Sequence, residues 1–367
     1  MDPRIEVLAR NLLSYSLDLQ AGEKLFIEGA TGSEELVRAL IAEAYRMGAQ
    51  PHFELTDPKL RRAWLLGASR EQMDRETAWA IRRVEDVEAR LYILAGDNAS
   101  EYSDVPSETT QSWRLAYKPY MDLVLQKKWC LLRFPTPAAA QAAEMSSEAF
   151  EQFCFDVSCL DYARMDGAMD PLVELMRRTD RVRIVGPGTD LSFSIAGIPV
   201  VKCAGKLNIP DGEVFTAPVR ESVEGTVAYN TPSLEDGTTF ENVTLTFERG
   251  RVVRATGRPQ DRLEAMLDTD EGARYLGEFA LGVNPHITRP MKDILYDEKI
   301  SGSLHLTPGN AYDDADNGNR SSVHWDLVLI QTPEWGGGEI WFDGVLVRRD
   351  GRFVLPELQG LNPENLV

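Results

Sequence analysis

Two spacings of apolar residues alternate along the first half of the chain. Apolar positions three or four residues apart predict helices, whereas short apolar runs predict buried strands. Helical spacing covers residues 5–17, 34–47, 70–83 and 111–126, and apolar runs cover residues 24–29, 51–55, 90–95 and 129–134. Ser33 is a predicted N-cap for the second helix, and Gly48 ends it. Strands alternating with helices predict a mainly parallel sheet with helices on its faces.

The pattern changes near Thr179, after which short β patterns and Gly-rich turns dominate. Residues 191–195 alternate strictly, residues 243–256 predict a hairpin, and Asp-Gly pairs at 343–344 and 350–351 predict hairpin turns. A helix is predicted to interrupt the strands at residues 261–279. The predicted fold is therefore an α/β domain over residues 1–180, followed by a β-rich α+β domain over residues 181–367.

Composition and charge exclude several classes of partner. The chain has 367 residues, 43% of them hydrophobic, and its net charge is -19. Nucleic-acid binding depends largely on cationic side chains that neutralise phosphates, so neither nucleic acid nor an anionic membrane is an expected partner. No apolar run approaches the length of a membrane span, and acidic residues precede the first apolar stretch. These features predict a cytoplasmic protein.

Several enzyme classes lack their sequence signatures. The four cysteines form no C-x-x-C pair, which excludes a thiolate zinc ribbon, and they are too few for a disulfide framework. A serine hydrolase elbow, G-x-S-x-G, is absent. Residues 29–33 form a Gly-rich turn after a predicted strand, but they do not match the G-x-G-x-x-G pattern. A dinucleotide-binding oxidoreductase is therefore not favoured.

A histidine and an aspartate share a face of a predicted strand at residues 321–331. Residues two apart on a strand point the same way, so His324 and Asp326 lie together, with Trp325 on the opposite face. This pair offers a nitrogen and an oxygen to a metal ion, although a structural His–Asp hydrogen bond explains it equally well. The histidines at 52 and 286 are interpreted as structural, with His286 a possible neighbour of the site.

A second histidine lies before an irregular turn. His305 precedes Pro308-Gly309, and Tyr312 follows on the same predicted loop. The histidine is either held near a site by this loop or merely capped within it. The phenol of Tyr312 can stabilise a developing oxyanion, although a tyrosine in such a place is more often a packing residue.

Three glutamates stand among small or apolar neighbours, at Glu213, Glu278 and Glu298. Burying a carboxylate is costly unless it is paired or bound to a metal ion. Three such glutamates, together with two histidines and Asp326, favour a metal centre.

At this point the sequence resembles a known family, the M29 metallopeptidases of the aminopeptidase T and aminopeptidase S type. The resemblance covers about the last half of the chain. It rests on residues 208–218, Gly277-Glu278, Asp297-Glu298, His305 with Gly309 and Tyr312, and His324-x-Asp326, in that order. The Thr307-Pro308 step and the acidic run at 313–316 depart from the family pattern, which leaves loop shape and substrate preference open.

The resemblance implies a metal-dependent aminopeptidase that acts on peptides with a free N-terminus, with an α/β N-terminal domain, a β-rich metal-bearing domain and a homodimeric assembly. It implies a pair of metal ions held by Glu213, Glu278, Glu298, His305, His324 and Asp326, with Tyr312 close to them. Either Glu213 or Glu278 is the proton acceptor. The alternative is a non-catalytic metal-binding or scaffold relative of such a peptidase.

Charge counting supports two metal ions independently of the resemblance. Glu213, Glu278, Glu298 and Asp326 carry four negative charges, which two divalent cations neutralise. Mixed imidazole and carboxylate ligands suit Zn²⁺, Co²⁺ or Mn²⁺. All three metals remain open from the sequence.

Overall fold

The computed structural model describes residues 2–98, 100–235 and 237–367. The chain forms two compact units, of which the first contains Met1–Cys159 and Gly205–Pro210 and the second contains Leu160–Ala204 and Asp211–Val367. The helix before residue 180 thus groups with the second unit. The division of domains at residue 180 stays a prediction.

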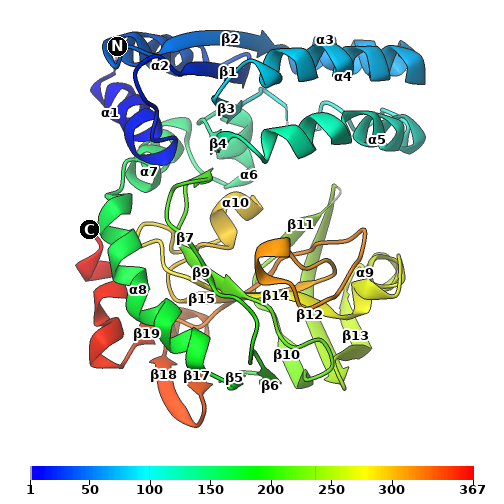
Figure 1. The fold of residues 1–367 in the computed structure, drawn as a ribbon. Helices are drawn as coiled ribbons and strands as arrows, with labels where there is room; N and C mark the ends of the chain where they lie inside the picture. Colours follow the sequence, from blue (N-terminus) through cyan, green and yellow to red (C-terminus); the bar gives the residue numbers. More distant parts are fainter. Residues whose placement is uncertain (1, 99, 236) are drawn as a thin grey trace. The chain divides into compact units, whose positions relative to one another are not determined.

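A parallel sheet forms the centre of the first unit, as the alternating pattern predicts (Figure 1). Its strand order is β2-β1-β3-β4-β8, and each neighbouring pair is parallel. The strands are β1 (Lys24–Ala30), β2 (Gln50–Thr56), β3 (Ala89–Leu94), β4 (Lys128–Arg133) and β8 (Asn208–Ile209). The four strands predicted in the first half are confirmed, with small shifts at their ends.

Helices connect these strands and bury their apolar faces in the first unit. They are α1 (Pro3–Asn11), a π-helical turn (Leu12–Ser16), α2 (Glu34–Arg46), α3 (Pro58–Gly67), α4 (Arg70–Glu85), α5 (Ser107–Val124), α6 (Pro137–Ala142) and α7 (Ser147–Ser158). Ser33 stands at the N-cap of α2, but its Oγ donates to the carbonyl of Ala30 and makes no cap hydrogen bond. No helix among the described residues is long and apolar enough to cross a membrane.

A nine-stranded antiparallel sheet forms one part of the second unit, in the order β11-β12-β10-β6-β5-β17-β18-β19, with β13 paired to β12. Its strands are β5 (Arg181–Gly186), β6 (Thr189–Ser194), β10 (Glu224–Ala228), β11 (Ser233–Glu235), β12 (Thr238–Glu248), β13 (Arg251–Arg258), β17 (Glu339–Phe342), β18 (Val345–Arg349) and β19 (Arg352–Phe353). Both predicted Asp-Gly turns join consecutive strands here. Asp343, Gly344, Asp350 and Gly351 all have positive φ, as type I′ turns require.

A second antiparallel sheet of the same unit carries the predicted site. Its order is β16-β15-β14-β9-β7. The strands are β7 (Val201–Cys203), β9 (Glu213–Thr216), β14 (Leu276–Gly282), β15 (Ser303–Pro308) and β16 (Leu327–Ile330). Every residue of β9, β14, β15 and β16 is buried, so a polar side chain there needs a specific partner.

The helices of the second unit are few and mostly short. They are α8 (Tyr162–Arg178), α9 (Gln260–Leu267), α10 (Ile294–Asp297) and the 3₁₀ turns Gly272–Arg274, Asp313–Ala315, Pro333–Trp335, Pro356–Leu361 and Pro363–Asn365.

The predicted helix at 261–279 is wrong in its second half. The helix ends at Leu267, and Glu278 lies on strand β14. Apart from Glu278, the residues of β14 are apolar or glycine, because the strand is buried on both faces. Such a run has no period that separates a strand from a helix. The predicted strand at 321–331 is also too long, since β16 begins only at Leu327.

Candidate metal centre

Four neighbouring strands bring the predicted ligands together. Glu213 begins β9, Glu278 lies on β14 and His305 on β15, and these strands are adjacent in the sheet. His324 and Asp326 immediately precede β16, which pairs with β15. Residues far apart in sequence thus meet on one part of a rigid sheet, which holds their side chains in defined positions.

The ligand atoms form two groups that share one residue. In Glu213, Glu278 and His305 they all lie within 4.8 Å of one another, and the same holds for Glu278, His324 and Asp326. Glu278 places Oε1 3.2 Å from Nε2 of His305 and Oε2 3.5 Å from Nε2 of His324. One oxygen of Glu278 therefore faces each group.

Glu298, the sixth predicted ligand, is not part of any such group among the described residues. Its Oε1 instead contacts the Nζ of Lys299, which lies 3.5 Å from Oε1 of Glu213 and 3.9 Å from Oδ1 of Asp211. Lys299 has no exposed surface. It supplies a cation to a third set of close donor atoms, from Cys203, Asp211 and Glu213. No sequence pattern indicates this role, because lysine is usually exposed.

Unpaired polar atoms show that the first group, Glu213 with Glu278 and His305, suits a cation. Oε2 of Glu213 and Nδ1 of His305 are buried and have no hydrogen-bond partner. A buried polar atom without a partner is costly, and a metal ion relieves this cost by coordination. Carboxylate oxygens and imidazole nitrogens are the donors that Zn²⁺, Co²⁺ and Mn²⁺ accept. The residues present therefore fit divalent metal ions.

The second group is oriented by hydrogen bonds from outside it. Nδ1 of His324 lies 2.9 Å from the carbonyl oxygen of Asn310, to which it can donate, and this leaves Nε2 facing Glu278 and Asp326. The hydroxyl of Thr307 donates to Oδ1 of Asp326. Ligating histidines commonly donate their other ring nitrogen in this way, which fixes the ring and its tautomer.

Two glycines allow the strands to approach closely at this point. Gly309 has a φ of 115° and forms a bridge with His324, and a Cβ at this position would lie 2.1 Å from a backbone carbonyl oxygen. A Cβ at Gly277, which precedes Glu278, would lie 2.4 Å from the carbonyl oxygen of Asn310. Neither position accepts a side chain unless the backbone moves.

The buried charges shift one another's proton affinity. Burial raises the pKa of Glu213 and of Glu278, against the attraction of Lys299 and His305 respectively. Burial acts to lower the pKa of His305, but its hydrogen bond with Glu278 and the nearby carboxylates raise it to about 10. Burial acts to lower the pKa of Lys299, but Glu213, Glu298 and Asp211 hold it well above its usual value. Without metal, the site therefore retains protons that a cation must displace.

Tyr312 lies beside His324 of the second group. Its ring centroid is 4.5 Å from that of His324 and 5.9 Å from that of Phe215. Desolvation of the phenol and the charges of Asp326 and Glu278 raise its pKa, even though 49% of the residue's surface is exposed. The phenol therefore keeps its proton near neutral pH and can donate it in a hydrogen bond.

A pocket of about 290 Å³ adjoins the second group. His324, Asp326 and Val328 form part of its wall, and two other chain segments complete it. Those segments contribute Thr231, Pro232, Ser233, Leu234, Glu235, Lys292, Asp293, Ile294 and Asp297. A molecule in this pocket would lie beside His324 and Asp326.

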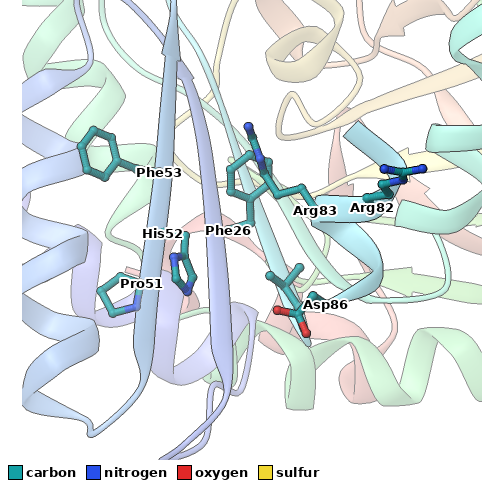
Figure 2. A pocket seen from close by; sticks show the side chains of 8 residues that line it. Phe26, Pro51, His52, Phe53, Arg82, Arg83 and Asp86 are labelled. Atoms are coloured by element: carbon teal, nitrogen blue, oxygen red, sulfur yellow. The ribbon is translucent and has the colours of Figure 1, made fainter. Parts of the chain in front are cut away.

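A second pocket, of about 480 Å³, lies in the first unit (Figure 2). Figure 2 shows His52 and Asp86 in its wall together with the guanidinium groups of Arg82 and Arg83. These residues are absent from the ligand groups found among the described residues, and Asp86 pairs with Lys24 at 2.8 Å. Two cationic side chains disfavour a metal ion in this pocket.

Comparison with known proteins places the chain in a family. The sequence profile of the thermophilic metalloproteases (M29) matches residues 1–353. The chain belongs to the M29 family. The predicted resemblance is thereby confirmed, and it extends beyond the C-terminal motifs that revealed it.

Individual relatives match this chain over nearly its whole length or over part of it. Aminopeptidase T of Thermus thermophilus is 29% identical over 405 residues, covering 96% of this chain and 98% of the relative. Aminopeptidase AmpS of Bacillus subtilis is 35% identical over 155 residues, covering 38% of this chain and 37% of the relative. The structure of wild-type AmpT from Thermus thermophilus superposes with a TM-score of 0.83 at 27% identity, covering 96% and 99% of the two chains. The predicted fold class is confirmed.

Proposed function

We propose that this M29 protein is an aminopeptidase that uses two metal ions to remove N-terminal residues from peptides. The observation that carries the proposal is the pair of ligand groups joined by Glu278, one oxygen of which faces each group. The relatives that match along the chain are named aminopeptidases, which supports the reaction class. The complete ligand groups speak against the alternative of a non-catalytic scaffold.

Each ion has its own set of side chains in this proposal. Glu213, Glu278 and His305 hold one ion, and Glu278, His324 and Asp326 hold the other. When bound, such ions polarise the peptide carbonyl and make a water molecule nucleophilic at neutral pH. Zn²⁺, Co²⁺ and Mn²⁺ all suit this donor set. Glu298 acts through Lys299 in this arrangement and not as a direct ligand.

Glu213 is the better candidate for the proton acceptor. Both oxygens of Glu278 face imidazole groups, so a bridging role occupies them. Oε1 of Glu213 lies 3.5 Å from Nζ of Lys299, and Oε2 has no hydrogen-bond partner. With one of these oxygens on an ion, the other would be left to accept a proton, and burial raises the pKa of this carboxyl. Glu213 can thus take a proton from the attacking water and pass it to the leaving amine.

Tyr312 is the candidate for stabilising the oxyanion. Its ring packs against His324, and its raised pKa keeps the phenolic proton available for donation. A donor aimed at developing negative charge contributes most where water is excluded. Tyr312 is partly exposed, which supports access of substrate from this side of the centre.

The test combines metal removal with blocked and unblocked substrates. Leucyl p-nitroanilide is incubated with the purified protein, with the EDTA-treated protein, and with that protein after Co²⁺ or Zn²⁺ is restored. Hydrolysis is expected to stop on chelation, return with metal, and be absent for the N-acetylated substrate. Full activity in the metal-stripped protein would reject the proposal.

A substitution at the site distinguishes loss of activity from loss of folding. His324→Ala is expected to abolish hydrolysis while far-UV circular dichroism remains that of the folded protein, because the residue lies outside the regular strands. His286→Ala is the matched control, since His286 lies outside the ligand groups of the described residues. Normal turnover by His324→Ala would show that the reaction takes place elsewhere.

A further inference from the structure

The pocket beside the second ligand group is placed to hold part of a substrate. His324 and Asp326 lie in its wall, so its contents are adjacent to the proposed reaction centre. Its volume of about 290 Å³ corresponds to about ten water molecules. That space admits one amino-acid side chain with its amine, and it is too small for several residues of a peptide.

Aliphatic side chains line this pocket and remain accessible. Leu234, from strand β11, is 45% exposed, and Ile294, at the start of α10, is 41% exposed. Pro232 and Val328 add further apolar surface. Covering exposed aliphatic surface with an apolar ligand is favourable in proportion to the area removed from water. The side chains of Leu234 and Ile294 therefore favour an aliphatic group in this pocket.

The charged groups of the pocket disfavour an anionic ligand. Glu235 and Asp293 stand beside one lysine, Lys292, so carboxylates outnumber ammonium groups. A carboxylate side chain entering here meets like charges, and such repulsion is a common source of specificity.

We propose that this pocket receives the side chain of the substrate's N-terminal residue, and that Leu234 and Ile294 select uncharged aliphatic side chains of the leucine and methionine class. This inference rests on the proposed aminopeptidase function and deepens it. Alanine leaves most of the pocket unfilled, and glutamate brings a charge to a wall that is already acidic. Discrimination between leucine and alanine is expected to be about 10-fold or more, since each missing methylene in an apolar pocket lowers the rate.

The experiment compares kcat/KM for the p-nitroanilides of leucine, methionine, alanine and glutamate. Leu234→Ala and Ile294→Ala are each expected to lower the leucine-to-alanine ratio by about fivefold or more, because each removes apolar contact with the longer side chain. Leu207→Ala is the matched control, because Leu207 is 44% exposed and lies in the first unit. It is expected to leave the ratio unchanged.

A variant that changes the charge of the pocket tests the proposal independently. Ile294→Lys is expected to raise the rate for glutamyl p-nitroanilide relative to the leucyl substrate, because it places a cation beside the entering side chain. Metal content and melting temperature are measured for every variant, so that loss of fold or of metal is recognised.

The outcomes separate the two proposals. If the wild-type protein hydrolyses none of the four substrates, the proposed function fails. If it hydrolyses them but the ratios are the same in wild type, Leu234→Ala and Ile294→Ala, the function stands and the pocket assignment is overturned. A wild-type preference for glutamate over leucine also overturns it.

Discussion

Replacing the buried lysine at the edge of the metal centre tests the electrostatics of the site. Nζ of Lys299 contacts Glu298 and lies 3.5 Å from a carboxylate oxygen of Glu213, with no surface exposed to water. At an effective dielectric constant of about 20, one such pair at this distance has a Coulomb energy of about 5 kcal/mol. Lys299→Met keeps a side chain of similar length and removes the charge.

The net loss of stability is expected to be about 3–5 kcal/mol in the metal-free protein, because buried carboxylates lose their cation. For a unit of this size each kcal/mol lowers the melting temperature by about 2–4 °C, so a fall of about 10 °C is expected with EDTA present. The fall should be smaller with Zn²⁺ or Co²⁺, since bound cations then neutralise Glu213. Thermal unfolding followed by circular dichroism measures both differences.

Lys202→Met is the matched control for this prediction. Lys202 also pairs with two carboxylates, Asp166 and Asp170, at 3.1 and 2.6 Å, but its side chain is 29% exposed. Exposed pairs contribute about 0–1 kcal/mol, so this variant should melt within a few degrees of wild type. If Lys299→Met and Lys202→Met have the same melting temperature in the presence of EDTA, the assigned role of the buried lysine is wrong.

Other predictions concern the metal ions themselves. Glu278→Gln should lower the content of both ions, because Glu278 belongs to both groups. Glu213→Gln should lose turnover but keep the ion held by His324 and Asp326. Elemental analysis measures the metal content of both variants, and equal metal loss would argue against a shared ligand. Adding Zn²⁺ to the metal-free protein at pH 7 should release protons, because the pKa of His305 is raised to about 10 and a ligand must lose its proton. The affinity for Zn²⁺ should accordingly fall as the pH is lowered. Calorimetry in buffers of different ionisation enthalpy measures the protons released on binding, and the absence of proton release would contradict this prediction. Metal at about 1,000 times its Kd should raise the free energy of unfolding by about 4 kcal/mol. Chelation should therefore lower the melting temperature, and an unchanged melting temperature would show that no ion is bound.

Local patterns in the sequence predict what depends on neighbours along the chain. The two-residue spacing of His324 and Asp326 places both in one ligand group, while Trp325 between them is buried against Phe240. The Asp-Gly turns and the parallel strands follow from similarly local rules. The glutamates were found because carboxylates stand out among apolar neighbours, a signal that does not require knowledge of the fold.

Features that depend on distant contacts could not be predicted in this way. A strand buried on both faces, such as β14 around Glu278, has no periodicity, so its pattern does not distinguish it from the end of a helix. Lys299 is a ligand-positioning residue only because Asp211 and Glu213 lie opposite it in the fold. The walls of the pocket come from three separate segments, and no pattern in the sequence brings Leu234 and Ile294 to the same pocket.

Anomalous diffraction from crystals of the purified protein, recorded at the absorption edge of the bound metal, tests the central claim most directly. Two peaks are predicted, one among Glu213, Glu278 and His305 and the other among Glu278, His324 and Asp326, with Glu278 in contact with both. A single peak, or density that touches neither group, would contradict the account.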